Sequence, residues 1–314
     1  MFQCGSAGPD RVFSPGMRAA TGARRLHSTT LVAAADRQPT RCARVLTVGA
    51  RGSVLAEMSR QQMATWGVVP AAGAGTRIQP LAFSKELLPL SVRQGEAEAR
   101  PRAVGEFIVE RFVAAGADRL CFVIAPGKSD IVQYFGGTVG GAPICYVLQD
   151  RPSGLCDAVF RAAMLVHADD RVFIGLPDTV WFPVDALRAL PESEVALLLF
   201  PVQRPALFDA VVTRSDGSVV EIQVKVAHPT SNWVWGAIGM PGHAFLALRD
   251  LWAARGSSDE YLGQLLNAWI TGGRRVVGVR AGDVYVDVGT VHGYREALAV
   301  LDGVGAPARA AAGA

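Results

Sequence analysis

Val68-Val69-Pro70-Ala71-Ala72-Gly73-Ala74-Gly75-Thr76-Arg77 is the stretch of this chain that decides the fold. Its apolar start predicts a buried strand, and the small residues that follow let the backbone turn sharply and approach a ligand. Successive N–H groups in such a turn form a concavity that binds anions. Arg77 and the nearby Lys85 add two positive charges at the same place. A glycine loop with an arginine and a lysine close behind it suits a triphosphate.

Two common glycine-loop motifs do not describe this segment. A Walker P-loop needs G-x-x-x-x-G-K-[ST], which is absent here. A Rossmann dinucleotide fingerprint needs a third glycine at position 78, where this chain has Ile78. A tight turn that binds nothing is the remaining alternative, and the Thr-Arg-x-x-Pro that follows the glycines argues against it.

The composition limits the classes of protein to which this chain can belong. The chain has 314 residues, half of them hydrophobic, with 34 glycines and 19% charged residues, which suits one large α/β domain. Nine arginines and three acidic residues lie within positions 1–66, which leaves 22 basic and 25 acidic residues in the remainder. The main part of the chain is therefore mildly acidic, and we expect no nucleic-acid partner. No apolar stretch reaches the ~18 residues of a membrane span.

The domain organisation follows from changes in composition. Residues 1–62 are rich in Ala, Gly, Ser and Arg and lack periodicity. We expect a disordered extension, or residues upstream of the true start, with an organellar transit peptide as the alternative. Residues 63–302 form the predicted domain, and 303–314 a flexible tail. The five cysteines show no disulfide or metal spacing, which indicates a reducing compartment and a cytoplasmic location.

Strand-like and helix-like segments alternate along the domain. This alternation predicts an α/β fold with a Rossmann-like, doubly wound mixed sheet. The expected strands are Leu120–Ala125, Ile144–Leu148, Val172–Leu176, Val195–Val202 and Gly236–Met240, and the expected helices are Val104–Ala115 and Tyr261–Ile270. Asp216-Gly217 predicts a hairpin between two further strands. We expect the polar residues 91–102 to be a surface excursion.

Two aspartates follow strand-like runs far apart in the sequence. Asp178 comes after Phe173–Leu176, and Asp287 comes after Tyr285-Val286. Ligands of open α/β sheets lie at the carboxyl ends of strands, and two carboxylates with phosphate oxygens are typical ligands of Mg²⁺. The alternative is that each aspartate only caps a local turn or helix.

The pattern G-x-G-T-R-x-x-P followed by S-K-E-L-L-P resembles the signature of the sugar-1-phosphate nucleotidyltransferases, above all the glucose-1-phosphate thymidylyltransferase branch. The resemblance covers residues 66–300 through five motifs in the family's order. It implies a fold of the nucleotide-diphospho-sugar transferase type. It also implies transfer of a nucleotidyl group from a nucleoside triphosphate, dTTP or UTP favoured, to a sugar-1-phosphate, with Mg²⁺.

The resemblance assigns the nucleotide half of the site. Asp178 matches the family's metal-binding aspartate and Asp287 its D-x-G-T motif, which implies that both hold the metal. By the same resemblance Arg77 faces the leaving pyrophosphate and Lys85 the α-phosphate. The nucleotide-binding positions that it implies are Ala72, Gly73, Ala74, Gly75, Thr76, Gln149 and Gly154.

The sugar half of the pattern departs from the family. Lys225 is kept and is implied to hold the sugar phosphate, but Val224 replaces an acid that binds sugar hydroxyls. Thr179 replaces an asparagine and Ala210 a glycine, and Glu260 matches a further sugar contact. Trp235 either stacks on the sugar or belongs to the core. The acceptor therefore stays open between a modified sugar-1-phosphate and another phosphomonoester.

Two rival functions follow from the same motifs. One is a nucleotidyltransferase that uses a non-sugar phosphate, in the manner of a choline-phosphate cytidylyltransferase. The other is a non-catalytic nucleotide-sugar-binding protein, which would be expected to lose Arg77, Lys85 or a metal aspartate, and none is lost. The base, the sugar and the oligomeric state stay open, a homo-oligomer included.

Removing residues 1–62 should leave a soluble and fully active protein, because this segment lacks periodic apolar residues that could dock on a core. Solubility, thermal unfolding and activity of the truncated and the full chain would be compared. Insolubility or loss of activity of the truncated protein would show that residues 1–62 contribute to the folded structure.

Overall fold

The computed structural model describes residues 63–93 and 99–305. The N-terminal extension expected from the sequence lies outside these residues. The last helix, α7 (Val291–Gly305), runs past the expected start of the tail at position 303. None of the helices in the described part of the chain is long and apolar enough to cross a membrane.

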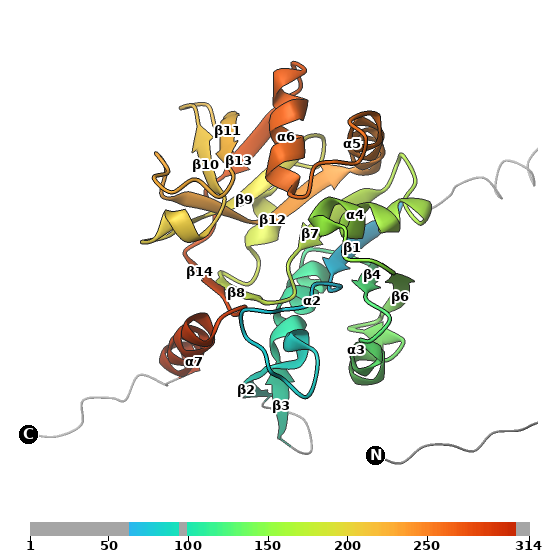
Figure 1. Ribbon diagram of the computed structural model, residues 1–314, viewed down its shortest axis with the longest axis vertical. Coiled ribbons are helices and arrows are strands. Elements are labelled where there is room, and N and C mark those ends of the chain that lie inside the picture. Colours follow the sequence, from blue (N-terminus) through green and yellow to red (C-terminus); the bar gives the residue numbers. More distant parts are fainter. Residues whose placement is uncertain (1–62, 94–98, 306–314) are drawn as a thin grey trace, which may run out of the picture. The chain divides into compact units, whose positions relative to one another are not determined.

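Four parallel strands form the centre of the main sheet (Figure 1). Their order is β6-β4-β1-β7, so the first strand lies inside, with later strands added on both sides. This is the arrangement of half a Rossmann sheet, and it confirms the fold predicted from the alternation of elements. The strands are β1 (Thr65–Pro70), β4 (Arg119–Ile124), β6 (Ala142–Leu148) and β7 (Arg171–Gly175).

An antiparallel extension widens the sheet beyond β7. β12 (Trp233–Pro241) runs antiparallel to β7 and to β9 (Val195–Pro201), and β9 pairs in parallel with β13 (Val276–Val279). The hairpin predicted around Asp216-Gly217 is present as β10 (Ala210–Thr213) and β11 (Val219–Gln223). The sheet is therefore mixed, with its parallel and antiparallel parts joined at the β7–β12 pair.

Two small sheets accompany the main one. β8 (Thr179–Phe182) pairs with β14 (Val284–Asp287), and β2 (Pro89–Arg93) pairs with β3 (Arg100–Ala103). The second pair lies within the surface excursion expected over residues 91–102, where Val92 is 53% exposed, and the strands were not predicted. Its arginines form ion pairs with glutamates of the following helix, Arg100 with Glu106 and Arg102 with Glu110.

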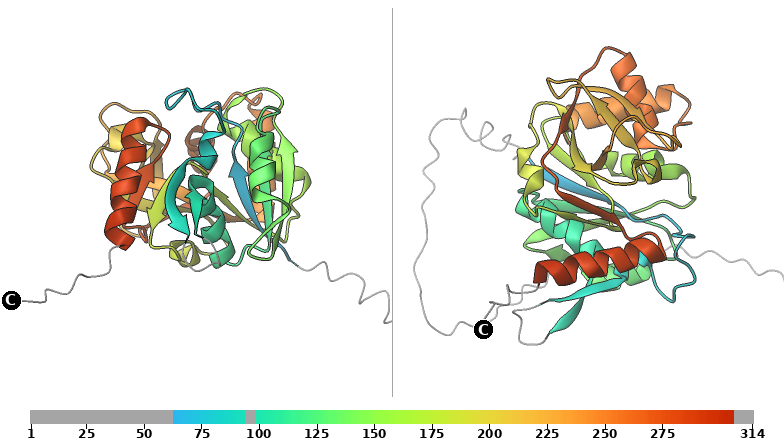
Figure 2. Two further views of the ribbon diagram at one scale, coloured as in Figure 1. Left: turned by 90° about the horizontal axis from the view of Figure 1, so that it is seen from below. Right: turned by 90° about the vertical axis from the view of Figure 1, so that its left-hand side faces the viewer.

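Helices cover both faces of the main sheet (Figures 1 and 2). Phe112 of α2 and Ile131 of α3 pack on one face, and Phe245 of α5 and Leu265 of α6 pack on the other. The helices predicted over 104–115 and 261–270 are confirmed to within a residue as α2 and α6. The remaining elements are α2 (Val104–Ala114), α3 (Ser129–Phe135), α4 (Gly154–Phe160), α5 (Gly242–Ala254), α6 (Leu262–Thr271), η1 (Lys85–Leu87), η2 (Arg161–Met164), η3 (Ala186–Ala189), η4 (Pro205–Leu207) and the short strand β5 (Thr138–Val139).

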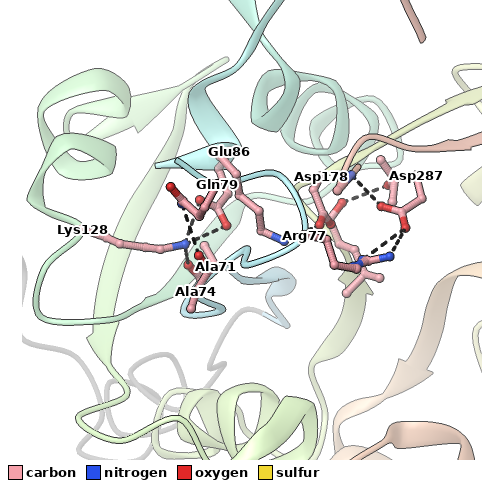
Figure 3. A network of polar contacts seen from close by, with 12 residues as sticks. Ala71, Ala74, Arg77, Gln79, Glu86, Lys128, Asp178 and Asp287 are labelled. Carbon is pink, nitrogen blue, oxygen red and sulfur yellow. Dashed lines mark hydrogen bonds and ion pairs between the residues drawn. The ribbon is translucent and has the colours of Figure 1, made fainter. Parts of the chain in front are cut away.

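A buried ion pair fastens the glycine loop to the sheet (Figure 3). Lys128, between β4 and α3, donates to both carboxylate oxygens of Glu86 at 2.8 Å and to the carbonyl of Ala71 at 2.7 Å. Glu86 is fully buried, and burial raises the pKa of its carboxyl although Lys128 and Lys85 oppose that shift. One ammonium thus joins the end of β1, the η1 turn and the loop after β4.

Lys128→Met should lower the free energy of unfolding by about 3–5 kcal/mol, because it leaves a buried carboxylate without its partner. The exposed pair of Arg249 with Asp250 gives a control, and Arg249→Met should change stability by no more than about 0.5 kcal/mol. Urea denaturation measures both. The double variant Glu86→Leu/Lys128→Met should regain part of the loss, and equal stability of the two single variants would contradict this role of the pair.

Candidate active site

The glycine loop after β1 lies at the carboxyl edge of the parallel strands. Gly75 has φ +65°, a conformation that favours glycine, and a Cβ there would lie 2.7 Å from Cδ of Lys85. The Lys85 side chain therefore runs directly over Gly75. Ala72 is buried, whereas Gly73, Ala74 and Thr76 are exposed along the loop. The Gln79 amide closes the loop with a hydrogen bond of 3.3 Å to the Ala74 carbonyl.

Asp178 and Asp287 meet at this edge because β8 and β14 pair. Asp287 lies opposite Thr179 in that ladder, and the Val288 N–H donates to the Asp178 carbonyl at 2.8 Å. A Cβ placed on Gly289 would lie 2.8 Å from Oδ1 of Asp287 and 3.3 Å from Oδ2 of Asp178. The two carboxylates thus face the same point, where Nη2 of Arg77 also lies 2.9 Å from the Cβ position, and a side chain at residue 289 would collide with all three groups.

Two cations from the glycine-loop segment form ion pairs with the two carboxylates, and Figure 3 shows the contact of Arg77 with Asp287. Lys85 Nζ donates to Oδ2 of Asp178, and both terminal nitrogens of Arg77 lie 3.3 Å from Oδ2 of Asp287. The Lys85 side chain is 14% exposed and that of Arg77 is 62% exposed. The ion pair of Lys85 with Asp178 is therefore largely shielded from water, whereas that of Arg77 with Asp287 is accessible to solvent.

The two carboxyl groups have pKa values displaced in opposite directions. Burial favours the neutral form of Asp178, but the charge and hydrogen bond of Lys85 outweigh it and lower the pKa of this carboxyl. Burial and the neighbouring Asp178 charge raise the pKa of Asp287, against the opposing effects of the Gly289 N–H and Arg77. Two acids in one site with separated pKa values are typical of functional sites.

The chemistry of the two carboxylates beside Gly289 suits a hard divalent cation. Carboxylate oxygens are the donors that such ions prefer, and Asp178 and Asp287 both supply them. Within residues 63–93 and 99–305, no three His, Cys, Asp or Glu side chains converge as a metal site. Phosphate or water oxygens would therefore have to supply the remaining ligands.

Gln149 and Gly154 lie together at the end of β6. Gln149 is 4% exposed, and its amide nitrogen donates to the Gly154 carbonyl at 3.2 Å and to Oδ2 of Asp157 at 2.7 Å. Gly154 has φ +87°, and a Cβ there would lie 2.7 Å from Cγ of Glu260. The carbonyl of Glu260 accepts the Leu155 N–H at 2.9 Å. Glu260 thus caps the segment that carries Gly154.

Lys225 occupies a strained position two residues after the end of β11. Its φ is +54°, in the left-handed region that non-glycine residues rarely adopt. Its side chain is 54% exposed, and Nζ lies 3.5 Å from Oδ1 of Asp209 and 5.6 Å from the centre of the Tyr261 ring. Strain of this kind persists where the surrounding structure enforces it, and it gathers at functional sites.

The other residues predicted for the sugar half are turned inward. Thr179 is 1% exposed and its hydroxyl donates to the Leu176 carbonyl at 3.0 Å. Ala210 is fully buried at the start of β10. Trp235 is 7% exposed and packs within the core, which supports the core role that the sequence left open.

Three residues near the site escaped the sequence analysis. Lys128 has no role that its local sequence predicts, although the scarcity of lysine in this chain is a signal that singles it out. Asp209 pairs with Lys225 and had no signal of its own. Tyr285 lines a cavity of about 340 Å³ together with Arg77 and Asp287.

Comparison with known proteins gives a consistent result. The nucleotidyl transferase family matches residues 66–302. A UTP–glucose-1-phosphate uridylyltransferase of Haloferax volcanii is 24% identical over 228 residues, which are 71% of this chain and 90% of that protein. A glucose-1-phosphate thymidylyltransferase of Streptomyces antibioticus is 29% identical over 170 residues, 52% of this chain and 46% of that protein.

A solved structure shares the fold. The UTP-bound UGPase of Acinetobacter baumannii superposes with a TM-score of 0.63 at 19% identity, over 78% of this chain and 95% of that one. The family match covers the glycine loop, the two aspartates and Lys225 in one continuous segment. The resemblance inferred from the motifs is thereby confirmed, and this chain belongs to the nucleotidyl transferase family.

Proposed function

We propose that this protein, in the cytoplasm, transfers a nucleotidyl group from UTP or dTTP to a sugar-1-phosphate and releases pyrophosphate. The observation that carries the proposal is the cluster at one edge of the sheet, where a glycine loop, Lys85 and Arg77 surround the paired carboxylates of Asp178 and Asp287. The relatives named for uridylyl and thymidylyl transfer to glucose 1-phosphate support the same reaction.

The reaction needs one bond formed and one broken at phosphorus. A phosphate oxygen of the sugar-1-phosphate attacks the α-phosphorus, and the bond from that phosphorus to the bridging oxygen of the β-phosphate breaks. Lys85 would hold the α-phosphate, Arg77 the leaving pyrophosphate, and Lys225 the incoming phosphate. No covalent bond to the protein is needed, because positioning and charge neutralisation lower the barrier.

Asp178 and Asp287 would hold Mg²⁺ when the substrates bind. The ion would supply charge neutralisation for the phosphate oxygens. Lys85 and Arg77 form ion pairs with the same two carboxylates. Binding of the ion would therefore involve a turn of these two side chains from the aspartates toward the phosphates.

A pyrophosphate-release assay tests the function across a matrix of the four common nucleoside triphosphates plus dTTP against several sugar-1-phosphates and choline phosphate. We expect turnover with UTP or dTTP and a sugar-1-phosphate. Turnover with choline phosphate alone would favour the non-sugar alternative. Nucleotide-sugar binding without any turnover would favour the non-catalytic one.

Asp178→Asn and Asp287→Asn should each lower turnover by ~100-fold or more while the fold is retained, because one neutral ligand leaves the cation under-coordinated. Turnover with Mg²⁺ and thermal unfolding would be measured for both. Asp185→Asn, a change at an exposed aspartate before η3, serves as the control. Near-normal activity of either site variant would refute the metal assignment.

Lys85 and Lys225 should act on different substrates. Lys85→Ala should lower kcat and weaken use of the triphosphate, whereas Lys225→Ala should mainly raise KM for the sugar phosphate. Lys225→Arg should restore little, since a planar guanidinium is bulkier than an ammonium. Steady-state kinetics with each substrate varied in turn measures this. Identical effects of both alanine variants on both substrates would speak against a two-sided pocket.

A further inference from the structure

Asp209 presents a buried carboxylate oxygen that lacks a hydrogen-bond donor. The residue comes directly before β10, and its side chain is 8% exposed. Among the described residues, Oδ1 has no hydrogen-bond partner. The Lys225 ammonium lies 3.5 Å away, close enough for an ion pair only. A buried hydrogen-bond acceptor without a donor raises the free energy of the folded protein. Oδ1 can therefore accept a hydrogen bond from a ligand.

The register of the β10–β11 hairpin explains why Asp209 lies close to Lys225. Ala210 of β10 pairs with Gln223 of β11, so Asp209 and Val224 are the next residues of the two strands beyond that pair. Val224 packs toward α6, with Cγ2 only 2.6 Å from where a Cβ on Gly263 would lie. The Val224 side chain therefore packs against the core, and Asp209 supplies a carboxylate at this end of the hairpin.

Aromatic contacts connect Asp209 with the metal-site carboxylates. The ring of its neighbour Phe208 meets the Tyr285 ring edge-on, with centroids 5.6 Å apart. Tyr285 lies on β14, two residues before Asp287. Burial raises the pKa of the Tyr285 hydroxyl, and the charges of Asp287, Asp178 and Asp209 raise it further. Asp209, with Lys225 beside it, therefore lies near the same tyrosine as the paired aspartates.

We propose that Asp209 is a specificity-determining residue whose carboxylate accepts hydrogen bonds from ring hydroxyls of the acceptor sugar. The proposal rests on the proposed function. When the half-exposed Lys225 side chain takes the phosphate of the acceptor, it uncovers the carboxylate, and a hydroxyl replaces the ammonium beside Oδ1. A carboxylate that depends on such a hydroxyl discriminates against analogues that lack it.

A purely structural role is the competing explanation, in which Asp209 only holds Lys225 in place. The two explanations differ in what they predict for the sugar. A structural counter-ion affects all acceptors that carry the same phosphate equally. A hydroxyl-binding carboxylate affects only those acceptors that carry the hydroxyl it binds.

The test compares glucose 1-phosphate with its singly deoxygenated analogues at saturating triphosphate. We expect the full-length wild-type protein to lose about 10- to 100-fold in kcat/KM with at least one deoxy analogue, the effect of a hydrogen bond to a charged group. Asp209→Ala should lose about as much with glucose 1-phosphate and should no longer distinguish that analogue. Asp209→Asn, which keeps the shape of the side chain, should show a smaller loss of the same kind.

Asp216→Asn is the matched control, because it makes the same change at an exposed turn of the same hairpin and should leave these preferences unaltered. Unchanged preferences in both Asp209 variants, or an equal loss with every acceptor, would overturn the inference. If the wild-type protein releases no pyrophosphate with any sugar-1-phosphate, the proposed function fails first, and the inference fails with it. The two failures are therefore distinguishable.

Discussion

β1 pairs in parallel with β4 on one side and with β7 on the other, and this double pairing determines where the charged groups of the site can lie. The chain leaves β1 and β7 at the same edge, so the glycine loop and Asp178 come together although many residues separate them. The ladder continues past β1, since the Ala71 N–H donates to the Val123 carbonyl at 2.7 Å. Lys128 then binds the Ala71 carbonyl and Glu86, so the loop that carries Lys85 is held from the buried side.

The small β8–β14 sheet adds the second constraint, since it carries Asp287 to Asp178 from near the end of the chain. The result is a compact set of two carboxylates and two cations of opposite sign. Burial alone would favour neutral acids here, yet Lys85 keeps the pKa of Asp178 low. Each charge is stabilised by a neighbour of opposite sign, so the two carboxylates and the two cations balance one another.

Local signals in the sequence predicted the glycine loop, α2, α6 and the Asp216-Gly217 hairpin, because each depends on residues close together in the chain. The hairpin of β2 and β3 escaped prediction because its arginines are held by glutamates on α2, which a polar segment does not reveal. The position of β9 next to β12 escaped it as well, since buried parallel and antiparallel strands share the same apolar composition. The motifs placed Asp178 and Asp287, whereas Asp209 gave no signal because its burial depends on the register of two strands.

The left-handed backbone at Lys225 lowers the stability of the folded protein. Glycine adopts that conformation freely, and other residues give up about 1–2 kcal/mol to do so. Exchange of Lys225 for glycine would thus relax the backbone while it removes the ammonium beside Asp209. Selection for heat resistance alone would favour glycine here, as it would at Ser257 with φ +55°, so a search for stabilised variants of the protein needs a screen that also reports turnover.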